Sequence, residues 1–166
     1  AIARAAKEGI LIKGGMYMEE LAKVTTIVFD KTGTLTIGKP IVNKVEVVNE
    51  AFDENRVVQL AAIADRRSSH PLAKAIFDYA AQSGLTYSEP DNFEVIKGRG
   101  VKAEVEGKTL LLGNQAMMTE NGISLPAIQS TLVETVIYLA VDGQSAGIFY
   151  VSDTIKEGAK EMIEGL

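Results

Sequence analysis

Apolar residues recur with helical spacing in two neighbouring stretches in the middle of the chain. Those of residues 56–64 fall on one stripe of a helix, and those of residues 72–80 form a second stripe. Ser68 or Ser69 can cap the second helix, and Pro71 suits its first turn. The pattern therefore predicts a pair of amphipathic helices, each with one buried face.

Short apolar or alternating runs surround this helix pair and predict strands. Asp142-Gly143 separates the last two runs and is a strong signal for a hairpin. Short helices are predicted at residues 115–120 and 126–133, and a final helix begins at Asp153. Tight turns between the strands indicate an antiparallel sheet and an α+β domain. The expected strands are residues 42–48, 93–96, 101–105, 109–112, 135–141 and 145–150.

The first thirty residues follow a different pattern. Ala-rich helical material precedes a short apolar run at residues 10–12, which is predicted to be a strand closed by Gly14-Gly15. A second helical stretch covers residues 18–23, and residues 25–29 are β-branched and apolar, as is typical of a buried strand. The two ends of the chain therefore resemble pieces of an α/β domain, with an inserted domain that begins near residue 41.

The run at residues 25–29 ends on Asp30, at the edge where open α/β sheets place their chemistry. A carboxylate there can attack a phosphoryl group and carry it as an aspartyl phosphate. Lys31 could neutralise phosphate oxygens, and the hydroxyls of Thr32 and Thr34 could hold them. The Asp30 carboxylate and the Thr32 carbonyl are also oxygen ligands of the kind that Mg²⁺ takes. The alternative for an isolated Asp after a strand is a turn or helix-cap residue.

His70 is the only histidine of the chain and stands at the start of the second amphipathic helix. Its ring could stack on a planar base or hydrogen-bond to it, and a helix N-terminus favours a nearby anion. The alternative is an exposed residue in the first turn of a helix.

Gly98 and Gly100 flank Arg99 between two predicted strands. A lone Gly-x-Gly is weak evidence for a site, and its alternative is a tight turn or bulge. The pair does not match the dinucleotide-binding fingerprint, because a strand and not a helix follows it. A Rossmann site is therefore not expected.

Composition excludes several classes of protein. With 166 residues the chain fits one domain, or one domain and part of a second. A net charge of −5 argues against a nucleic-acid-binding surface, and the absence of Cys excludes disulfides and thiolate metal sites. The apolar runs are too short to cross a bilayer. The chain starts with Ala and shows no signal peptide, so we expect it to be a piece of a longer protein.

Residues 30–36, Asp-Lys-Thr-Gly-Thr-Leu-Thr, resemble the phosphorylation motif of P-type ATPases. Residues 68–72 are similar to the Ser-x-His-Pro-Leu signature in the nucleotide-binding domain of the heavy-metal-transporting members of that family. The resemblance implies that Asp30 accepts the γ-phosphate of ATP, with Lys31 and Thr32 beside it and Mg²⁺ on oxygens of Asp30 and Thr32.

The same resemblance implies a nucleotide site farther along the chain. Gly98-Arg99-Gly100 is similar to a Gly-x-Gly loop of the subfamily, and Gly113-Asn114 to another pair that lines its nucleotide pocket. Asp65 stands five residues before the histidine, where the subfamily usually has Glu, so the carboxylate is kept on a shorter side chain. The implied nucleotide-binding residues are Asp65, His70, Gly98, Gly100, Gly113 and Asn114.

The implied fold is α+β, with an antiparallel sheet flanked by helix pairs and inserted into a truncated haloacid-dehalogenase-like α/β phosphorylation domain. Residues 1–40 would be the N-terminal part of the phosphorylation domain, residues 41–150 the nucleotide-binding domain, and residues 151–166 the return segment. Residues 153–156 resemble an Asp-x-x-Lys element that marks this return near a hinge.

The function implied is that of the cytosolic, ATP-binding part of a membrane pump that exports a heavy-metal cation. ATP and Mg²⁺ would be its cofactors, and its partners the remaining phosphorylation, actuator and membrane domains. The family's Thr-Gly-Asp and Gly-Asp-Gly-x-Asn-Asp elements do not occur in the chain. We therefore expect it to bind ATP or ADP with little or no turnover. The run Lys13-Gly14-Gly15 resembles the zinc, cadmium and cobalt branch more than the copper branch.

Three other classes stay open. A free-standing phosphatase of the same superfamily would have a general acid/base Asp two positions after Asp30, where this chain has Thr32. A non-catalytic, regulatory nucleotide-binding module would bind ATP without phosphoryl transfer. A structural interaction domain would not respond to ATP at all.

Overall fold

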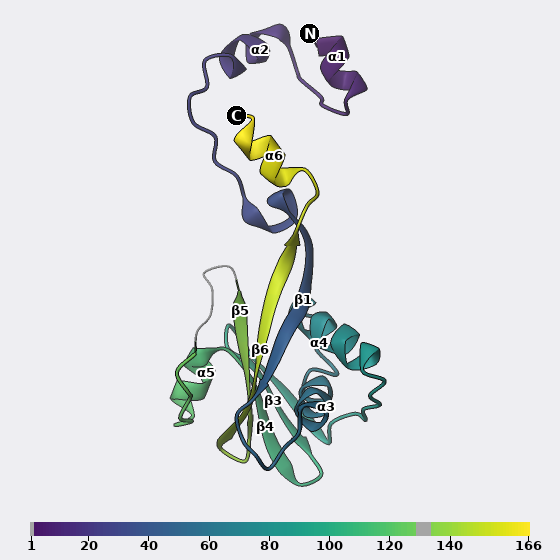
Figure 1. Ribbon diagram of the computed structural model, residues 1–166, viewed down its shortest axis with the longest axis vertical. Helices are drawn as coiled ribbons and strands as arrows, with labels where there is room; N and C mark the ends of the chain where they lie inside the picture. Colours follow the sequence, from purple (N-terminus) through teal and green to yellow (C-terminus); the bar gives the residue numbers. More distant parts are fainter. Residues whose placement is uncertain (1, 129–133) are drawn as a thin grey trace. The chain divides into compact units, whose positions relative to one another are not determined.

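The computed structural model describes residues 2–128 and 134–166 (Figure 1). Contacts divide the chain into two compact units, of which the first ends at Lys31 and the second begins at Thr32. In the first unit, α1 (Ile2–Lys7) and α2 (Gly15–Leu21) confirm the two predicted helical stretches, although α2 begins and ends earlier than expected. The three-part organisation with boundaries at residues 40 and 150 stays a prediction.

The strands predicted at residues 10–12 and 25–29 are wrong. Within the described part of the chain neither run is a strand, and Ile27 and Val28 are 50% and 91% exposed. A strand needs a hydrogen-bonded neighbour, and β-branched apolar composition shows only that a segment suits burial. No described strand pairs with either run.

The second unit is built on a six-stranded sheet with the order β1-β6-β5-β4-β3-β2. Every neighbouring pair is antiparallel, which confirms the predicted α+β class. The Asp142-Gly143 turn joins β5 to β6 with positive φ at both residues, 49° and 81°, as a type I′ hairpin requires. The strands are β1 (Thr36–Val47), β2 (Asn92–Ile96), β3 (Gly100–Val105), β4 (Lys108–Gly113), β5 (Thr135–Val141) and β6 (Gln144–Ile155).

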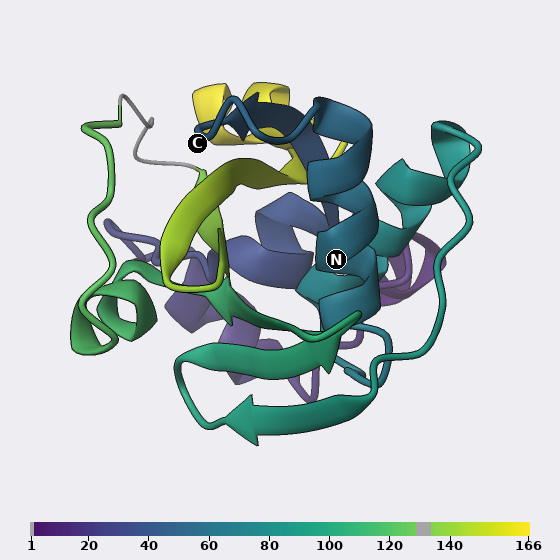
Figure 2. The same ribbon diagram turned by 90° about the horizontal axis from the view of Figure 1, so that it is seen from below.

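Helices cover both faces of this sheet (Figures 1 and 2). The predicted pair, α3 (Glu54–Ala64) and α4 (Pro71–Gln82), packs on one face, and α5 (Gln115–Glu120) packs on the other. Successive strand residues face opposite ways, so Leu110 and Leu112 lie in the core under α3 and α4 while Leu111 lies in the core under α5. The central strands β4 and β5 are therefore buried on both faces, whereas the edge strands β1 and β2 are largely exposed.

One helix prediction in this unit is wrong, and a second lies mostly outside the described residues. Asp153 does not begin a helix, because β6 continues to Ile155 and α6 spans Ala159–Glu164. Of the helix predicted at residues 126–133, residues 126–128 are not helical and residues 129–133 lie outside the described residues. Asp153 stays extended because it is paired with the opposite strand at Pro40.

The Asp153 carboxylate closes an irregularity in the pairing of β1 with β6. The register shifts between Thr36 and Pro40, and the backbone N–H groups in between need other acceptors. Asp153 accepts from the N–H of Gly38 and the N–H of Lys39, each at 3.0 Å, and from the Thr36 hydroxyl. The side chain therefore takes the place of a ladder partner at the start of β1.

Replacing Asp153 by Ala is expected to lower the free energy of unfolding by about 1–2 kcal/mol, because one hydroxyl and two backbone donors lose a charged acceptor. Urea unfolding followed by circular dichroism measures the loss. Asp91→Ala is the matched control, since Asp91 is exposed and is expected to change stability by less than about 0.5 kcal/mol. Equal stability of the two variants would contradict the role given to Asp153.

The helices found within residues 2–128 and 134–166 are all too short or too polar to span a bilayer.

Candidate functional site

A cavity of about 390 Å³ lies in the second unit, a size within the range of roughly 300–1,000 Å³ that small-molecule sites occupy. Its walls come from the loop between α3 and α4, the β2–β3 turn, the end of β4 and the start of β5. All six residues implied for the nucleotide site line this one cavity: Asp65, His70, Gly98, Gly100, Gly113 and Asn114. Three segments that are separate in the sequence, around residues 65–70, 98–100 and 113–114, therefore meet at one place.

Apolar side chains make up much of the remaining wall. Leu72 from α4, Val95 and Ile96 from β2, and Val136 and Ile137 from β5 all contribute. Such a wall suits a flat, weakly polar ring, which gains from leaving water and packing against aliphatic groups. Polar groups are few and are placed around it, as in sites that bind small molecules by shape and a handful of hydrogen bonds.

Asp65 supplies a buried carboxyl group to the cavity. It is the C-terminal cap residue of α3 and is only 7% exposed. Burial raises the pKa of Asp65 from its ordinary value of 3.8 to about 6, while a side-chain hydrogen bond with Ser68 acts in the opposite direction. Around neutral pH the carboxyl is therefore ionised but poorly solvated, and it can accept a hydrogen bond from an amino group of a ligand.

His70 is the N-cap residue of α4, a role that the sequence prediction gave to Ser68 or Ser69. Its Nδ1 accepts the backbone N–H of Leu72 at 3.2 Å, while Ser68 Oγ accepts the N–H of His70. Because Nδ1 acts as the acceptor, the neutral ring carries its proton on Nε2. The ring is exposed, so it offers a flat face and one N–H donor.

Two of the glycines are required by the packing of the sheet itself. A Cβ atom built on Gly100 would lie 2.2 Å from the carbonyl oxygen of Leu112, and one on Gly113 would lie 2.4 Å from that of Arg99. Gly98 differs, since a Cβ there would meet nothing within 4 Å and only its φ of +71° favours glycine. Close approach of β3 and β4 therefore requires glycine at positions 100 and 113, whereas Gly98 fits the tight-turn alternative given for the Gly98–Gly100 loop.

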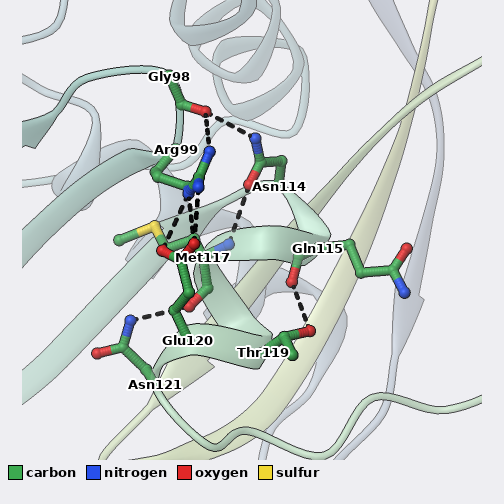
Figure 3. Close-up of polar contacts among 8 residues, drawn as sticks. All are labelled: Gly98, Arg99, Asn114, Gln115, Met117, Thr119, Glu120 and Asn121. Atoms are coloured by element: carbon green, nitrogen blue, oxygen red, sulfur yellow. Dashed lines mark hydrogen bonds and ion pairs between the residues drawn. The ribbon is translucent and has the colours of Figure 1, made fainter.

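Asn114 also has a structural role (Figure 3). Its Oδ1 accepts the N–H of Met117 at 3.0 Å and caps α5, and its Nδ2 donates to the carbonyl oxygen of Gly98 at 3.0 Å. Its backbone N–H donates to the carbonyl oxygen of Arg99 at 2.9 Å. The residue therefore ties the Gly98–Gly100 turn to the start of α5.

Arg99, which lines the cavity, and its partner Glu120 are two residues that the sequence reasoning did not single out. Figure 3 shows the Arg99 guanidinium directed at the Glu120 carboxylate, with Nη2 2.7 Å from Oε1 and Nε about 3 Å from both oxygens. The hydrogen bond from Arg99 lowers the pKa of Glu120. An Arg between two glycines was visible in the sequence, but nothing marked Glu120, which is 21 residues farther on, as its partner.

The boundary between the two units divides the phosphorylation motif between Lys31 and Thr32. Asp30, Lys31 and Thr32 are each exposed. After Thr32 the backbone turns at Gly33, whose carbonyl oxygen accepts Nζ of Lys156 at 2.6 Å. In the described residues no group of three His, Asp or Glu side chains could hold a metal ion.

Comparisons with known proteins agree with the residue-based resemblance. A family model of haloacid dehalogenase-like hydrolases matches residues 24–166. A copper-exporting P-type ATPase of Staphylococcus aureus (strain JH9) is 40% identical over 170 residues, which cover 98% of this chain and 20% of the relative. The chain thus spans about a fifth of the length of the curated relatives it matches.

Solved structures give the same result for the fold. The catalytic domain of the CPx-ATPase CopB-B superposes with a TM-score of 0.74 at 27% identity, over 99% of this chain and 58% of that one. A zinc-transporting PIB-type ATPase in its E2.Pi state superposes with a TM-score of 0.73 at 30% identity, over 99% and 27% of the two chains. The resemblance to heavy-metal-transporting P-type ATPases is therefore confirmed.

Proposed function

This chain belongs to the haloacid dehalogenase-like hydrolases, and on that premise we propose that it is the nucleotide-binding part of a heavy-metal-transporting P-type ATPase. One observation carries the proposal. The six residues implied for nucleotide binding come from three separate segments and line a single cavity of suitable size. Its apolar walls and single buried carboxyl group suit a purine base better than a sugar or a peptide.

In the proposed complex the base packs against the apolar wall. The Asp65 carboxylate accepts a hydrogen bond from an exocyclic amino group, and the His70 ring stacks on the base or donates from Nε2. The turn at Gly98 lets the backbone approach the ligand closely, since no side chain stands between them. These contacts distinguish adenine, which offers an amino group, from bases that do not.

In the whole pump we propose that a carboxylate oxygen of Asp30 attacks the γ-phosphorus of ATP, forming an aspartyl phosphate as the bond to ADP breaks. The Asp30 carboxylate and the Thr32 carbonyl are hard oxygen donors that fit Mg²⁺, which usually takes one or two carboxylates plus phosphate oxygens and water. When bound, Mg²⁺ neutralises phosphate charge. Lys31 would add a further positive charge at the same place.

The remaining domains of such a pump would be the partners of this chain, which would lie on the cytosolic side of the cell membrane. We propose a heavy-metal cation as the cargo. The curated relatives are named copper-exporting, whereas residues 13–15 favoured the zinc, cadmium and cobalt branch. Among the solved structures a zinc-transporting ATPase is 30% identical, so the comparisons name both metals.

Calorimetric titration with ATP tests the nucleotide site. His70→Asn is the informative variant, because Asn caps helices well and keeps α4 intact while the imidazole is lost. Its ATP affinity is expected to fall by about tenfold, equivalent to about 1.4 kcal/mol. Asp30→Ala is the control and is expected to bind ATP like the unaltered protein. Unchanged binding by His70→Asn, or a loss confined to Asp30→Ala, would contradict the proposed site.

A further inference from the structure

Arg99 and Glu120 form an ion pair at the rim of the cavity. Their side chains are 38% and 55% exposed, and Arg99 lines the cavity while Glu120 does not. The guanidinium meets the carboxylate with two nitrogens, which fixes its direction more firmly than a single contact would. This is a geometry that a lysine could not reproduce.

The backbone beneath Arg99 is held in place independently of this ion pair. Asn114 binds the carbonyl oxygens of both Gly98 and Arg99, at 3.0 Å and 2.9 Å. Loss of the ion pair would therefore free the Arg99 side chain without releasing the turn that carries it. The side chain can respond to a ligand while the cavity wall stays unchanged.

The charges around the cavity are few. Among the described lining residues, Arg99 carries the one permanent positive charge, and Asp65 is the acidic residue. A nucleotide must keep its phosphates near water, because burying them would forfeit their hydration. The base therefore takes the apolar interior beside Asp65, and the phosphates stay at the exposed rim, where Arg99 lies.

We propose that the Arg99–Glu120 pair sets how strongly the phosphate groups of a nucleotide contribute to its binding. Arg99 attracts the phosphates, and Glu120 weakens that attraction by neutralising the guanidinium and drawing it toward α5. Glu120 need not touch the ligand, so it acts through Arg99. The proposal rests on the proposed function, since it requires a nucleotide in this cavity.

The attraction between Arg99 and phosphate would act at the solvent-exposed rim of the cavity. Dissolved salt therefore weakens this attraction, whereas it affects stacking of the base much less. Adenosine has no phosphate, and negative charge rises from AMP through ADP to ATP. A change of charge at the rim should accordingly produce an effect that is graded along this series.

Affinities for adenosine, AMP, ADP and ATP would be measured by calorimetry for the unaltered protein, Glu120→Gln, Arg99→Gln and Asp78→Asn. Asp78→Asn is the matched control, because it removes an equal charge from an exposed ion pair, Lys74–Asp78 at 3.1 Å, on α4. Glu120→Gln is expected to bind ATP roughly threefold to tenfold more tightly at low salt, and Arg99→Gln more weakly by a similar factor. Adenosine affinity should stay unchanged in every variant.

Raising the salt concentration from about 20 mM to about 300 mM should reduce both effects and leave adenosine binding unchanged. Equal shifts for adenosine and ATP would overturn the proposal, since they would indicate a change in the cavity itself. So would an Asp78→Asn variant that matches Glu120→Gln, or affinities that do not change at all. Failure of the unaltered protein to bind any of the four ligands would instead overturn the proposed function.

Discussion

Asp65→Asn is expected to stabilise the folded protein by about 2–3 kcal/mol near neutral pH and to weaken its binding of ATP. The carboxyl group is 7% exposed, and its pKa in the folded state is about 6 against an ordinary value of 3.8. At about 1.4 kcal/mol per pH unit, that interval corresponds to about 3 kcal/mol. Asn has no charge to desolvate, and its amide can keep a hydrogen bond with Ser68.

The sign of the pH dependence follows from which state binds more protons. Between pH 3.8 and about 6 the folded state keeps the Asp65 proton that the unfolded chain has already lost. The contribution of Asp65 to stability therefore falls as the pH rises through this window and is constant above it. The stabilisation by Asp65→Asn should be small at about pH 4 and complete at about pH 7.

Urea unfolding of both proteins across this pH range measures the difference, in which the titration of all other groups cancels. Asp91→Asn, an exposed substitution of the same kind, should change stability by less than about 0.5 kcal/mol at every pH. If Asp65→Asn were less stable than the unaltered protein at pH 7, the interactions of the buried carboxylate would outweigh its loss of hydration, and the prediction would be wrong.

The affinity of the unaltered protein for ATP should also fall below pH 6, because a protonated Asp65 accepts hydrogen bonds poorly.

Gly100→Ala is expected to lower the free energy of unfolding by about 3 kcal/mol or more. The added Cβ would lie 2.2 Å from Leu112 O and 2.5 Å from Gly113 Cα, both of which belong to the backbone of β4. Backbone cannot rotate away as a flexible side chain can, so β3 and β4 would have to separate at this end. The φ of +155° at Gly100 adds strain for any residue that has a Cβ.

Chemical unfolding gives the size of this loss, and Gly107→Ala separates its two causes. Gly107 also has a positive φ, +74°, but a Cβ there meets nothing within 4 Å. This control should cost only about 1 kcal/mol, from backbone strain alone. If both variants lost the same stability, close packing of β3 on β4 would not be the reason for glycine at position 100. Because Gly100 lines the cavity, Gly100→Ala should also weaken ATP binding.

The periodicity of apolar residues correctly predicted the helices and the hairpin that are determined by residues close together in the sequence. The stripes of α3 and α4 gave buried residues such as Leu60 and Ile76, each fully enclosed. The hairpin at Asp142-Gly143 was equally predictable, since its turn type depends on those two residues alone.

The local sequence pattern was insufficient where the conformation of a segment depends on a partner far away in the chain. Asp153 was assigned to a helix because its hydrogen bonds to Gly38 and Lys39 cross more than a hundred residues.

The candidate site also combines features that the sequence predicted with features that depend on distant partners. Resemblance gave six residues that the structure brings to one cavity, although it did not show that Gly100 and Gly113 are also needed by the sheet. The capping role of His70 was given to its neighbours, because an imidazole is a less usual cap than a serine hydroxyl. The pairing of Arg99 with Glu120 depends on where the β2–β3 turn lies relative to α5, which no local pattern shows.

The pairing of β1 with β6 bears on how such a domain can be carried inside another protein. Thr36 and Ile155 are direct partners in the ladder, so the chain enters and leaves the sheet at neighbouring points. If residues 36–155 are inserted into another domain, the two points where the chain leaves and re-enters that domain lie close together. The insertion therefore costs that domain little more chain entropy than a short loop would. Adjacent ends of this kind also permit circular permutation, in which the old termini are joined by a few residues and new ones are opened at an exposed turn.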